Sequence, residues 1–195
     1  MKSFSHYHTS LNEAEKHMKP LLKFTKSHIG ARDLITLSSF PEVQNLKKYT
    51  QAAPNEMERK PKGIWFGIGN SWIDWLEYNM PQWAEPSIMK VEVNMSKMLN
   101  IKKDKDLDVF AKKYTFKDKD MWVADWKSLA KDYDGIIMWI HPPSARMFGD
   151  DPNAIWYGWD VPSGCVWNPS AIKKINIIGR YNDFENRDGG EYVKV

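Results

Sequence analysis

Short segments of two different periods alternate along this chain, and that mixture limits the folds open to it. Residues 87–95 alternate apolar and polar side chains with the period of a half-buried strand, whereas residues 104–114 place Leu107, Phe110 and Tyr114 at helical spacing. Further strands are expected at 33–39, 63–67, 136–140, 165–167 and 171–178, and helices at 41–50, 70–79 and 125–132. Because no regular strand–helix–strand repeat joins these segments, the pattern predicts a single-domain α+β fold and not a doubly wound sheet.

The composition is that of a folded protein with an aromatic-rich core. The 195 residues include 10 Trp, 8 Tyr and 8 Phe, more than a disordered chain carries, and the length is sufficient for one domain with a substantial core. The single cysteine, Cys165, lies in an apolar segment and is expected in the core. One cysteine excludes an intramolecular disulfide framework and a multi-thiolate zinc site, and it is compatible with a reducing compartment.

Neither the apolar segments nor the charge indicates a membrane or nucleic-acid protein. No segment approaches the ~20 apolar residues that cross a bilayer, and the first residues lack an apolar signal core. The formal net charge of +3 permits contact with phosphates without indicating a nucleic-acid-binding surface. We therefore expect a cytoplasmic protein that makes no contact with a membrane.

Three regions are predicted along the chain. Residues 1–32 are polar and basic with apolar residues at helical spacing, which predicts a helical extension lying on the domain; a helix for a membrane or a partner is the alternative. Residues 33–178 carry the predicted strands and helices and form the main domain. Residues 179–195 are a polar tail in which 192–195 could add an edge strand.

Common catalytic motifs are missing from the sequence. It contains no Walker loop, no G-x-G-x-x-G fingerprint, no H-E-x-x-H and no G-x-S-x-G. What remains is an ordered set of short segments: GIWF at 63–66 followed by NSW at 70–72, then YDGI at 133–136, then WNP at 167–169 before a hydrophobic segment with two lysines.

In this order the segments resemble the ADP-ribosyltransferase superfamily, including its toxin-type and poly(ADP-ribose) polymerase-type enzymes. The resemblance covers about residues 33–178, and it implies an α+β domain with split or curved mixed sheets that binds NAD. The implied function is transfer of ADP-ribose from NAD to a macromolecular acceptor, either protein or nucleic acid, in the manner of phage or toxin enzymes.

The resemblance also assigns roles to individual residues. It implies that Trp65 stacks on the nicotinamide ring and that Ser71, at the start of a helix, helps to hold it. Thr36 and Ser38 match the ribose side of the site. The remaining residues that it implies for NAD binding are Gly63, Trp72 and Asn168. Asp160 and Ser163 are the candidates for the catalytic position, where a carboxylate would stabilise the oxocarbenium-like transition state.

Two departures from the family pattern leave alternatives open. Thr36 stands where the family usually has Arg or His, and Ser163 falls near the position of the usual Glu, with Asp160 as the nearest acid. These departures favour a catalytically inactive module that binds a nucleotide or a partner protein. Asp160 could equally be a turn residue that hydrogen-bonds the loop backbone.

The tryptophans allow both structural and binding interpretations. Four tryptophans lie on apolar faces and are predicted in the core: Trp72, Trp75, Trp126 and Trp139. Residues 155–159 contain Trp156, Tyr157 and Trp159 in a predicted loop, where large aromatic residues favour a binding surface. The third functional class is therefore an interaction protein without a small ligand, with this loop as its interface.

Overall fold

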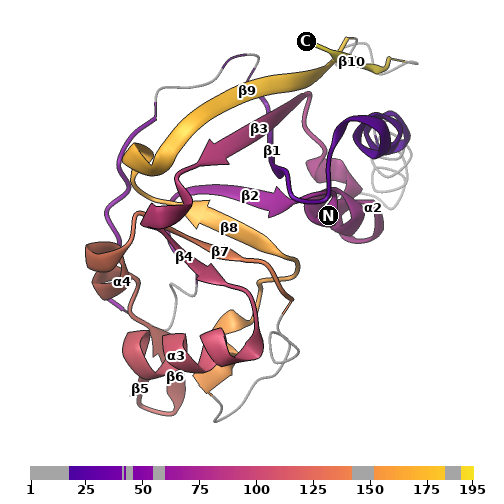
Figure 1. The fold of residues 1–195 in the computed structure, drawn as a ribbon. Helices are drawn as coiled ribbons and strands as arrows, with labels where there is room; N and C mark the ends of the chain where they lie inside the picture. Colours follow the sequence, from indigo (N-terminus) through magenta and orange to yellow (C-terminus); the bar gives the residue numbers. More distant parts are fainter. Residues whose placement is uncertain (1–17, 41, 43–45, 55–59, 142–151, 183–189) are drawn as a thin grey trace, which may run out of the picture. The chain divides into compact units, whose positions relative to one another are not determined.

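A computed structural model describes residues 18–40, 42, 46–54, 60–141, 152–182 and 190–195, and within them the chain is mixed α and β. In chain order the elements are β1 (Leu34–Ser38), β2 (Ile64–Ile68), α2 (Ser71–Asn79), β3 (Ser87–Val93), β4 (Met98–Ile101), α3 (Asp104–Tyr114), β5 (Thr115–Asp118), β6 (Met121–Ala124), α4 (Trp126–Asp132), β7 (Gly135–Met138), β8 (Ser163–Val166), β9 (Ile172–Tyr181) and β10 (Tyr192–Lys194), with a helix over 18–28 ahead of β1 (Figure 1). The predicted α+β class is confirmed.

The chain divides into two compact units, each built from segments far apart in sequence. The first contains Met1–Gln44, Phe66–Val91 and Lys174–Val195, and the second contains Asn45–Trp65 and Glu92–Lys173. Each unit has its own hydrophobic core. The boundary between the units falls within strands β2, β3 and β9, so each of these strands contributes residues to both units.

The first unit is built on antiparallel strands in the order β10-β9-β3-β1-β2. Strand β1 pairs with β3 from Leu34 opposite Val91 to Ser38 opposite Ser87, and with β2 on its other side. Val91 is buried, and its exposed neighbour Glu92 shows the alternation that predicted β3.

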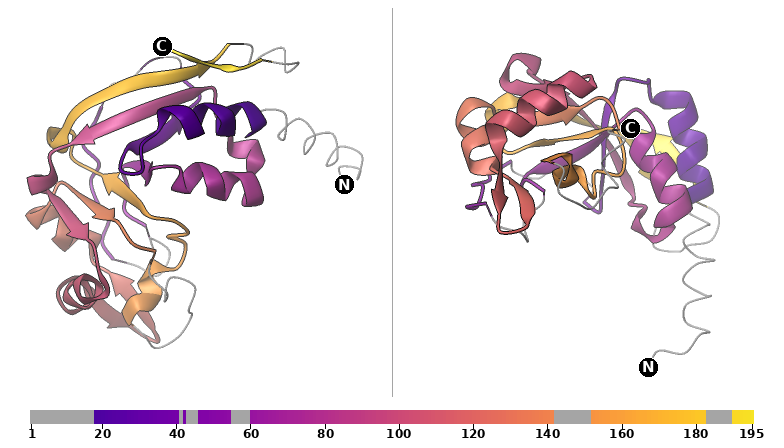
Figure 2. Two further views of the ribbon diagram at one scale, coloured as in Figure 1. Left: turned by 45° about the vertical axis from the view of Figure 1, so that its right-hand side comes forward. Right: turned by 90° about the horizontal axis from the view of Figure 1, so that it is seen from below.

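Two helices cover these strands in the first unit. Figure 2 shows the helix over 18–28 beside α2, and both contribute to the same core, with Leu21, Ile73 and Leu76 fully buried. Gly179 on β9 allows this packing, because a Cβ atom there would lie 2.6 Å from the ring of Phe24.

The second unit combines parallel and antiparallel pairing. Strand β7 lies parallel to β4 and antiparallel to β8, and β5 pairs with β6 as a separate hairpin. Helix α3 buries Leu107, Phe110 and Tyr114, as its sequence spacing predicted. Helix α4 begins after Asp125, whose carboxylate accepts a hydrogen bond from the Ser128 backbone N–H at 2.9 Å.

The predicted aromatic loop at 155–159 is largely core, which corrects its interpretation as a binding surface. Trp156 and Trp159 are 0% and 1% exposed, whereas Tyr157 is 38% exposed. A short 3-10 helix, η4 (Pro152–Trp156), and a turn at Gly158 with φ of +89° bring both indoles inward. Trp156 packs on Phe110 of α3 with 4.7 Å between ring centroids.

Two other segments differ from their predictions. Residues 46–50, expected in a helix over 41–50, are not helical, and the Tyr49 N–H instead donates to the Trp167 carbonyl at 2.7 Å; residues 41 and 43–45 lie outside the described part. The β5–β6 hairpin was not predicted. Its turn contains Lys119 at φ +52°, a conformation usually taken by Gly or Asn, and neither of these residues occupies that position.

Both terminal segments contribute to the first unit where they are described. The helix over 18–28 contributes Met18, Leu21 and Phe24 to its core, and β10 pairs with β9, as expected for an edge strand at 192–195. In the described residues, no helix has the length and apolar character needed to span a membrane.

Candidate functional site

The junction between β2 and α2 positions Ser71 at the start of a helix, as its sequence context predicted. The Ser71 Oγ accepts a hydrogen bond from the Ile68 backbone N–H at 3.1 Å. Gly69 turns the chain with φ of +57°, and a Cβ atom there would lie 3.0 Å from the Ala31 carbonyl oxygen. Backbone conformation and the limited space therefore both favour glycine at this turn.

Two further predicted residues, Thr36 and Ser38, are half-buried on β1 in the same unit. The Thr36 hydroxyl makes a long contact, 3.4 Å, with the Leu37 carbonyl. The Ser38 Oγ accepts a hydrogen bond from the Phe40 N–H at 3.1 Å. Both hydroxyls thus contact nearby backbone.

Trp65 belongs to the second unit and packs against the aromatic segment at 155–159. Its ring meets Trp159 edge to face, with 4.8 Å between centroids at 64°, and its indole N–H donates to the Pro61 carbonyl at 3.2 Å. The Nζ of Lys60 lies 5.5 Å from the centre of the Trp65 ring. Trp65 is half-buried, so its ring is only partly covered by these neighbours.

Lys60 lies beside the Trp65 ring, and the charge of Asp160 affects its pKa. Desolvation lowers the pKa of Lys60, and the negative charge of Asp160 acts in the opposite direction. Neither an ion pair within 4.0 Å nor a hydrogen bond joins the Lys60 ammonium to any described residue. Gly158 borders the amine, since a Cβ atom there would lie 3.4 Å from Lys60 Cε. Lys60 was not identified from the sequence, because nothing in the polar loop around it indicates that the folded chain desolvates its amine and places it beside an indole.

Ser163 and Gly63 have structural contacts in the second unit. The Ser163 hydroxyl is buried and donates to the Val161 carbonyl at 2.9 Å. A Cβ atom on Gly63 would lie 2.6 Å from the Cys165 Sγ, so only glycine lets the chain pass so close to β8. Cys165 itself is fully buried, as predicted, and burial raises the pKa of its thiol, which makes it a poor nucleophile.

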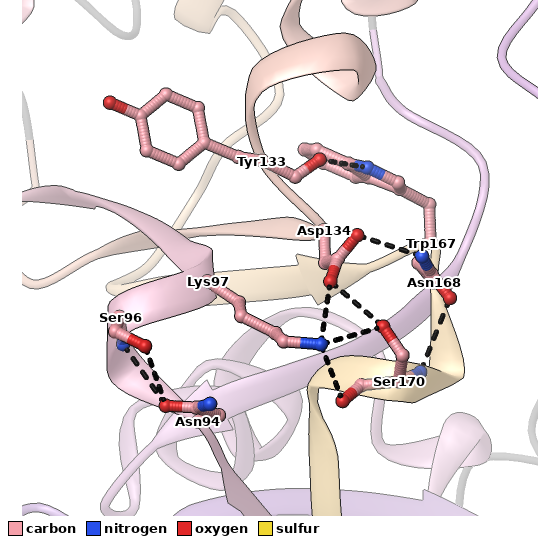
Figure 3. Close-up of polar contacts among 8 residues, drawn as sticks. All are labelled: Asn94, Ser96, Lys97, Tyr133, Asp134, Trp167, Asn168 and Ser170. Carbon is pink, nitrogen blue, oxygen red and sulfur yellow. Dashed lines mark hydrogen bonds and ion pairs between the residues drawn. The ribbon is translucent and has the colours of Figure 1, made fainter.

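Asn168 lies in a polar network around Asp134, shown in Figure 3. One carboxylate oxygen of Asp134 accepts from the Asn168 side-chain amide at 2.7 Å, and the other accepts from the Ser170 hydroxyl at 2.8 Å and lies 3.5 Å from the Lys97 Nζ. The Asn168 Oδ1 accepts from the Ser170 N–H at 3.2 Å. We call these four residues the Asp134 clamp; it engages both polar groups of the Asn168 side chain.

The clamp joins three segments of the second unit. The Asp134 carbonyl accepts from the backbone N–H groups of Trp167 and Asn168, both at 3.1 Å, while the Asp134 N–H donates to the Lys97 carbonyl at 2.9 Å. The Trp167 indole N–H donates to the Tyr133 carbonyl at 2.8 Å (Figure 3). The YDGI segment at 133–136 and the WNP segment at 167–169 are therefore in direct contact.

The structure thus brings some of the predicted site residues together. Trp65 lies near Lys60 and packs on Trp159, the residue before Asp160, in the second unit, which also contains Gly63, Ser163 and Asn168. The first unit contains Thr36, Ser38, Ser71 and Trp72. Across the described part of the chain, no group of three or more His, Cys, Asp or Glu side chains is suited to hold a metal ion.

An indole face, an ammonium and a carboxylate form the chemically distinctive group of the second unit. A flat ligand can stack on the indole, a carboxylate accepts hydrogen bonds from hydroxyls and stabilises positive charge, and an ammonium donates to oxygen atoms. Comparisons with models of protein families, with curated proteins and with solved structures found no match to this chain.

Proposed function

We propose that this protein is an NAD-dependent ADP-ribosyltransferase that acts on a macromolecular acceptor. The observation that carries the proposal joins Trp65 to the segment of Asp160: the Trp65 ring packs on the ring of Trp159, the residue before Asp160, with 4.8 Å between centroids, and the Lys60 Nζ lies 5.5 Å from the Trp65 ring. The sequence resemblance had assigned Trp65 and Asp160 to the nicotinamide and ribose parts of the same ligand. They lie almost a hundred positions apart in the chain, and nothing in either segment alone requires them to be close.

In the proposed reaction the bond between C1′ of the ribose and the nicotinamide nitrogen breaks. The bonding electron pair leaves with nicotinamide, which becomes neutral, and positive charge develops on the ribose. Asp160 would stabilise that charge, and an oxygen or nitrogen of the acceptor would then bond to C1′ and lose a proton. Ser71, Thr36 and Ser38 keep their implied NAD-binding roles as predictions.

Lys60 adds a condition to this proposal. The nicotinamide ring of NAD is cationic, and a cation favours the face of an indole. The Lys60 ammonium already lies near the Trp65 ring, so the pyridinium and the ammonium would compete if they used the same face. NAD binding would then move Lys60 away from the ring, and Lys60→Met would strengthen NAD binding.

One observation favours the alternative of an inactive nucleotide-binding module. Ser163, near the position of the family's usual glutamate, donates its hydroxyl to the Val161 carbonyl. Its side chain therefore supports a local turn and offers no carboxylate. Under this alternative the protein binds NAD without cleaving it.

The test is incubation with NAD labelled on its adenylate phosphate, in the presence of a cell extract, followed by separation of protein, nucleic acid and free nucleotide. Transferase activity predicts label in protein or nucleic acid with equimolar nicotinamide release, lost in Asp160→Asn and retained in Asp108→Asn, an exposed carboxylate of α3. Thermal stabilisation by NAD without release supports the inactive module. Neither stabilisation nor release would refute both functions.

A further inference from the structure

Three tryptophans of the first unit form a stack that is not sealed in its core. Trp72 and Trp75 of α2 are parallel to within 10°, with 5.0 Å between ring centroids. Trp83, in the short 3-10 helix η1 (Pro81–Trp83), lies 6.4 Å from Trp72 and 6.2 Å from Trp75. We call these three residues the tryptophan stack.

The buried face of α2 anchors the tryptophan stack on the first unit, and the three rings remain partly exposed to solvent. Ile73 and Leu76 bury the inner face of α2, and Gly67 on β2 lets the helix start close to the strand, since a Cβ atom there would lie 2.6 Å from the Trp72 Cβ. Trp72 and Trp75 are half-buried, whereas Trp83 is 49% exposed. Among the described residues, no acceptor forms a hydrogen bond with the indole N–H of Trp72, Trp75 or Trp83.

Such an exposed group of large aromatic residues is unusual on a protein surface. Exposed single apolar residues are common, but contiguous ones mark interaction sites, and Trp and Tyr dominate the energetics of protein interfaces. Tyr78, on the outer side of the same helix, is 82% exposed. Helix α2 therefore carries aromatic surface that the described residues of its unit leave exposed.

The charge of this segment points to one class of partner. Residues 63–89 contain no Lys, Arg or His, although the whole chain has 28 Lys and Arg and a net charge of +3. Asp74 and Glu77 are exposed on α2. Indoles and carboxylates on one helix both attract cations, and the carboxylates repel phosphates, which disfavours nucleic acid and anionic lipid as the partner of α2.

We propose that the tryptophan stack and the acidic residues of α2 form a docking site for an arginine- or lysine-rich segment of a partner protein. Guanidinium groups stack on indole faces and also pair with carboxylates, so successive arginines of one segment can use both features of α2. The inference does not depend on the proposed transferase activity, and its test involves no NAD.

The experiment measures fluorescence anisotropy of a labelled peptide of alternating Arg and Gly, with a Glu and Gly peptide as its opposite-charge counterpart. The full chain is expected to bind the first peptide and not the second. Trp83→Ala should weaken binding about 2–5-fold, the range for one exposed cation–π contact. The double variant Asp74→Asn, Glu77→Gln should weaken binding and reduce its dependence on salt.

Two controls separate this site from general effects. Phe116→Ala removes an aromatic residue of the second unit that is 41% exposed, and it should leave peptide binding unchanged. Circular dichroism and thermal unfolding of each variant establish that it is folded. Equal binding of the Arg peptide by the wild type and Trp83→Ala would overturn the proposal. So would Trp83-dependent binding of neutral oligosaccharides or phosphatidylcholine vesicles without binding of the Arg peptide.

Discussion

Replacement of Asp134 by alanine tests the main polar contacts of the second unit. The substitution removes two hydrogen bonds to a charged acceptor, from Asn168 at 2.7 Å and Ser170 at 2.8 Å, together with the 3.5 Å ion pair with Lys97. Hydrogen bonds to charged groups each contribute about 1.5–3 kcal/mol when desolvated. The ion pair is partly exposed and contributes less than about 1 kcal/mol.

Water can replace part of this network, because Ser170 is exposed and the Asp134 side chain is 23% exposed. We therefore expect Asp134→Ala to lower the free energy of unfolding by about 2–4 kcal/mol. The backbone hydrogen bonds of residue 134 remain in the variant. Asp134→Asn keeps the shape and one acceptor oxygen, so its loss should be smaller.

Urea denaturation followed by circular dichroism measures this loss, with an unchanged m-value as the sign that only stability has changed. The corresponding fall in melting temperature is about 4–16 °C for a chain of this length. Asp108→Ala, on the exposed side of α3, is the matched control and should stay within about 0.5 kcal/mol of the wild type. If Asp134→Ala were as stable as this control, the Asp134 clamp would make no measurable contribution to the free energy of unfolding.

Four further outcomes follow from the structure. Trp156→Ala should destabilise the protein by about 3–5 kcal/mol in urea denaturation, because it empties a fully buried indole site; a loss below 1 kcal/mol would contradict its core position. Gly158→Ala should cost about 1–2 kcal/mol through its positive φ, whereas Gly30→Ala, at a glycine without positive φ, is the control. Desolvation lowers the pKa of Lys60 in the folded protein, so at pH values between this lowered pKa and the ordinary lysine pKa the unfolded chain binds more protons than the folded one. The free energy of unfolding should therefore rise with pH across that range. Lys60→Met should remove this rise, measured as the midpoint of urea denaturation at each pH. Asp160→Asn should abolish nicotinamide release with NAD-dependent thermal stabilisation retained, and equal release in both proteins would exclude Asp160 from catalysis.

Local patterns predicted much of the fold. Helix α3 and strand β3 follow directly from the spacing of their buried residues, Phe110 and Val91 among them. The orientation of Trp156 and Trp159 did not follow, because it depends on a turn at Gly158 and on the rings of α3 and α4 against which they pack. The β5–β6 hairpin was not predicted because Lys119 adopts a positive φ in its turn, and a lysine does not indicate such a conformation.

The candidate site shows the same division. The sequence singled out Trp65 and Asp160 separately, through their segments. It could not identify Lys60, whose importance comes from the Trp65 indole beside it and from the charge of Asp160 that affects its pKa. The tryptophan stack was not predicted: helical spacing grouped Trp72 with Trp75 and assigned both to the core, whereas both are half-buried, and the contribution of Trp83 depends on η1 turning back toward the helix.

The interleaving of the two units has a consequence for synthesis on the ribosome. Strand β3 leaves the ribosome long before β9, its neighbour in the first unit, because residues 94–171 are translated between them. Until then one edge of β3 has no partner from its own chain, and an open strand edge can pair with another nascent molecule. Translation of β9 is thus the step that closes this edge and ends the period of greatest exposure to aggregation.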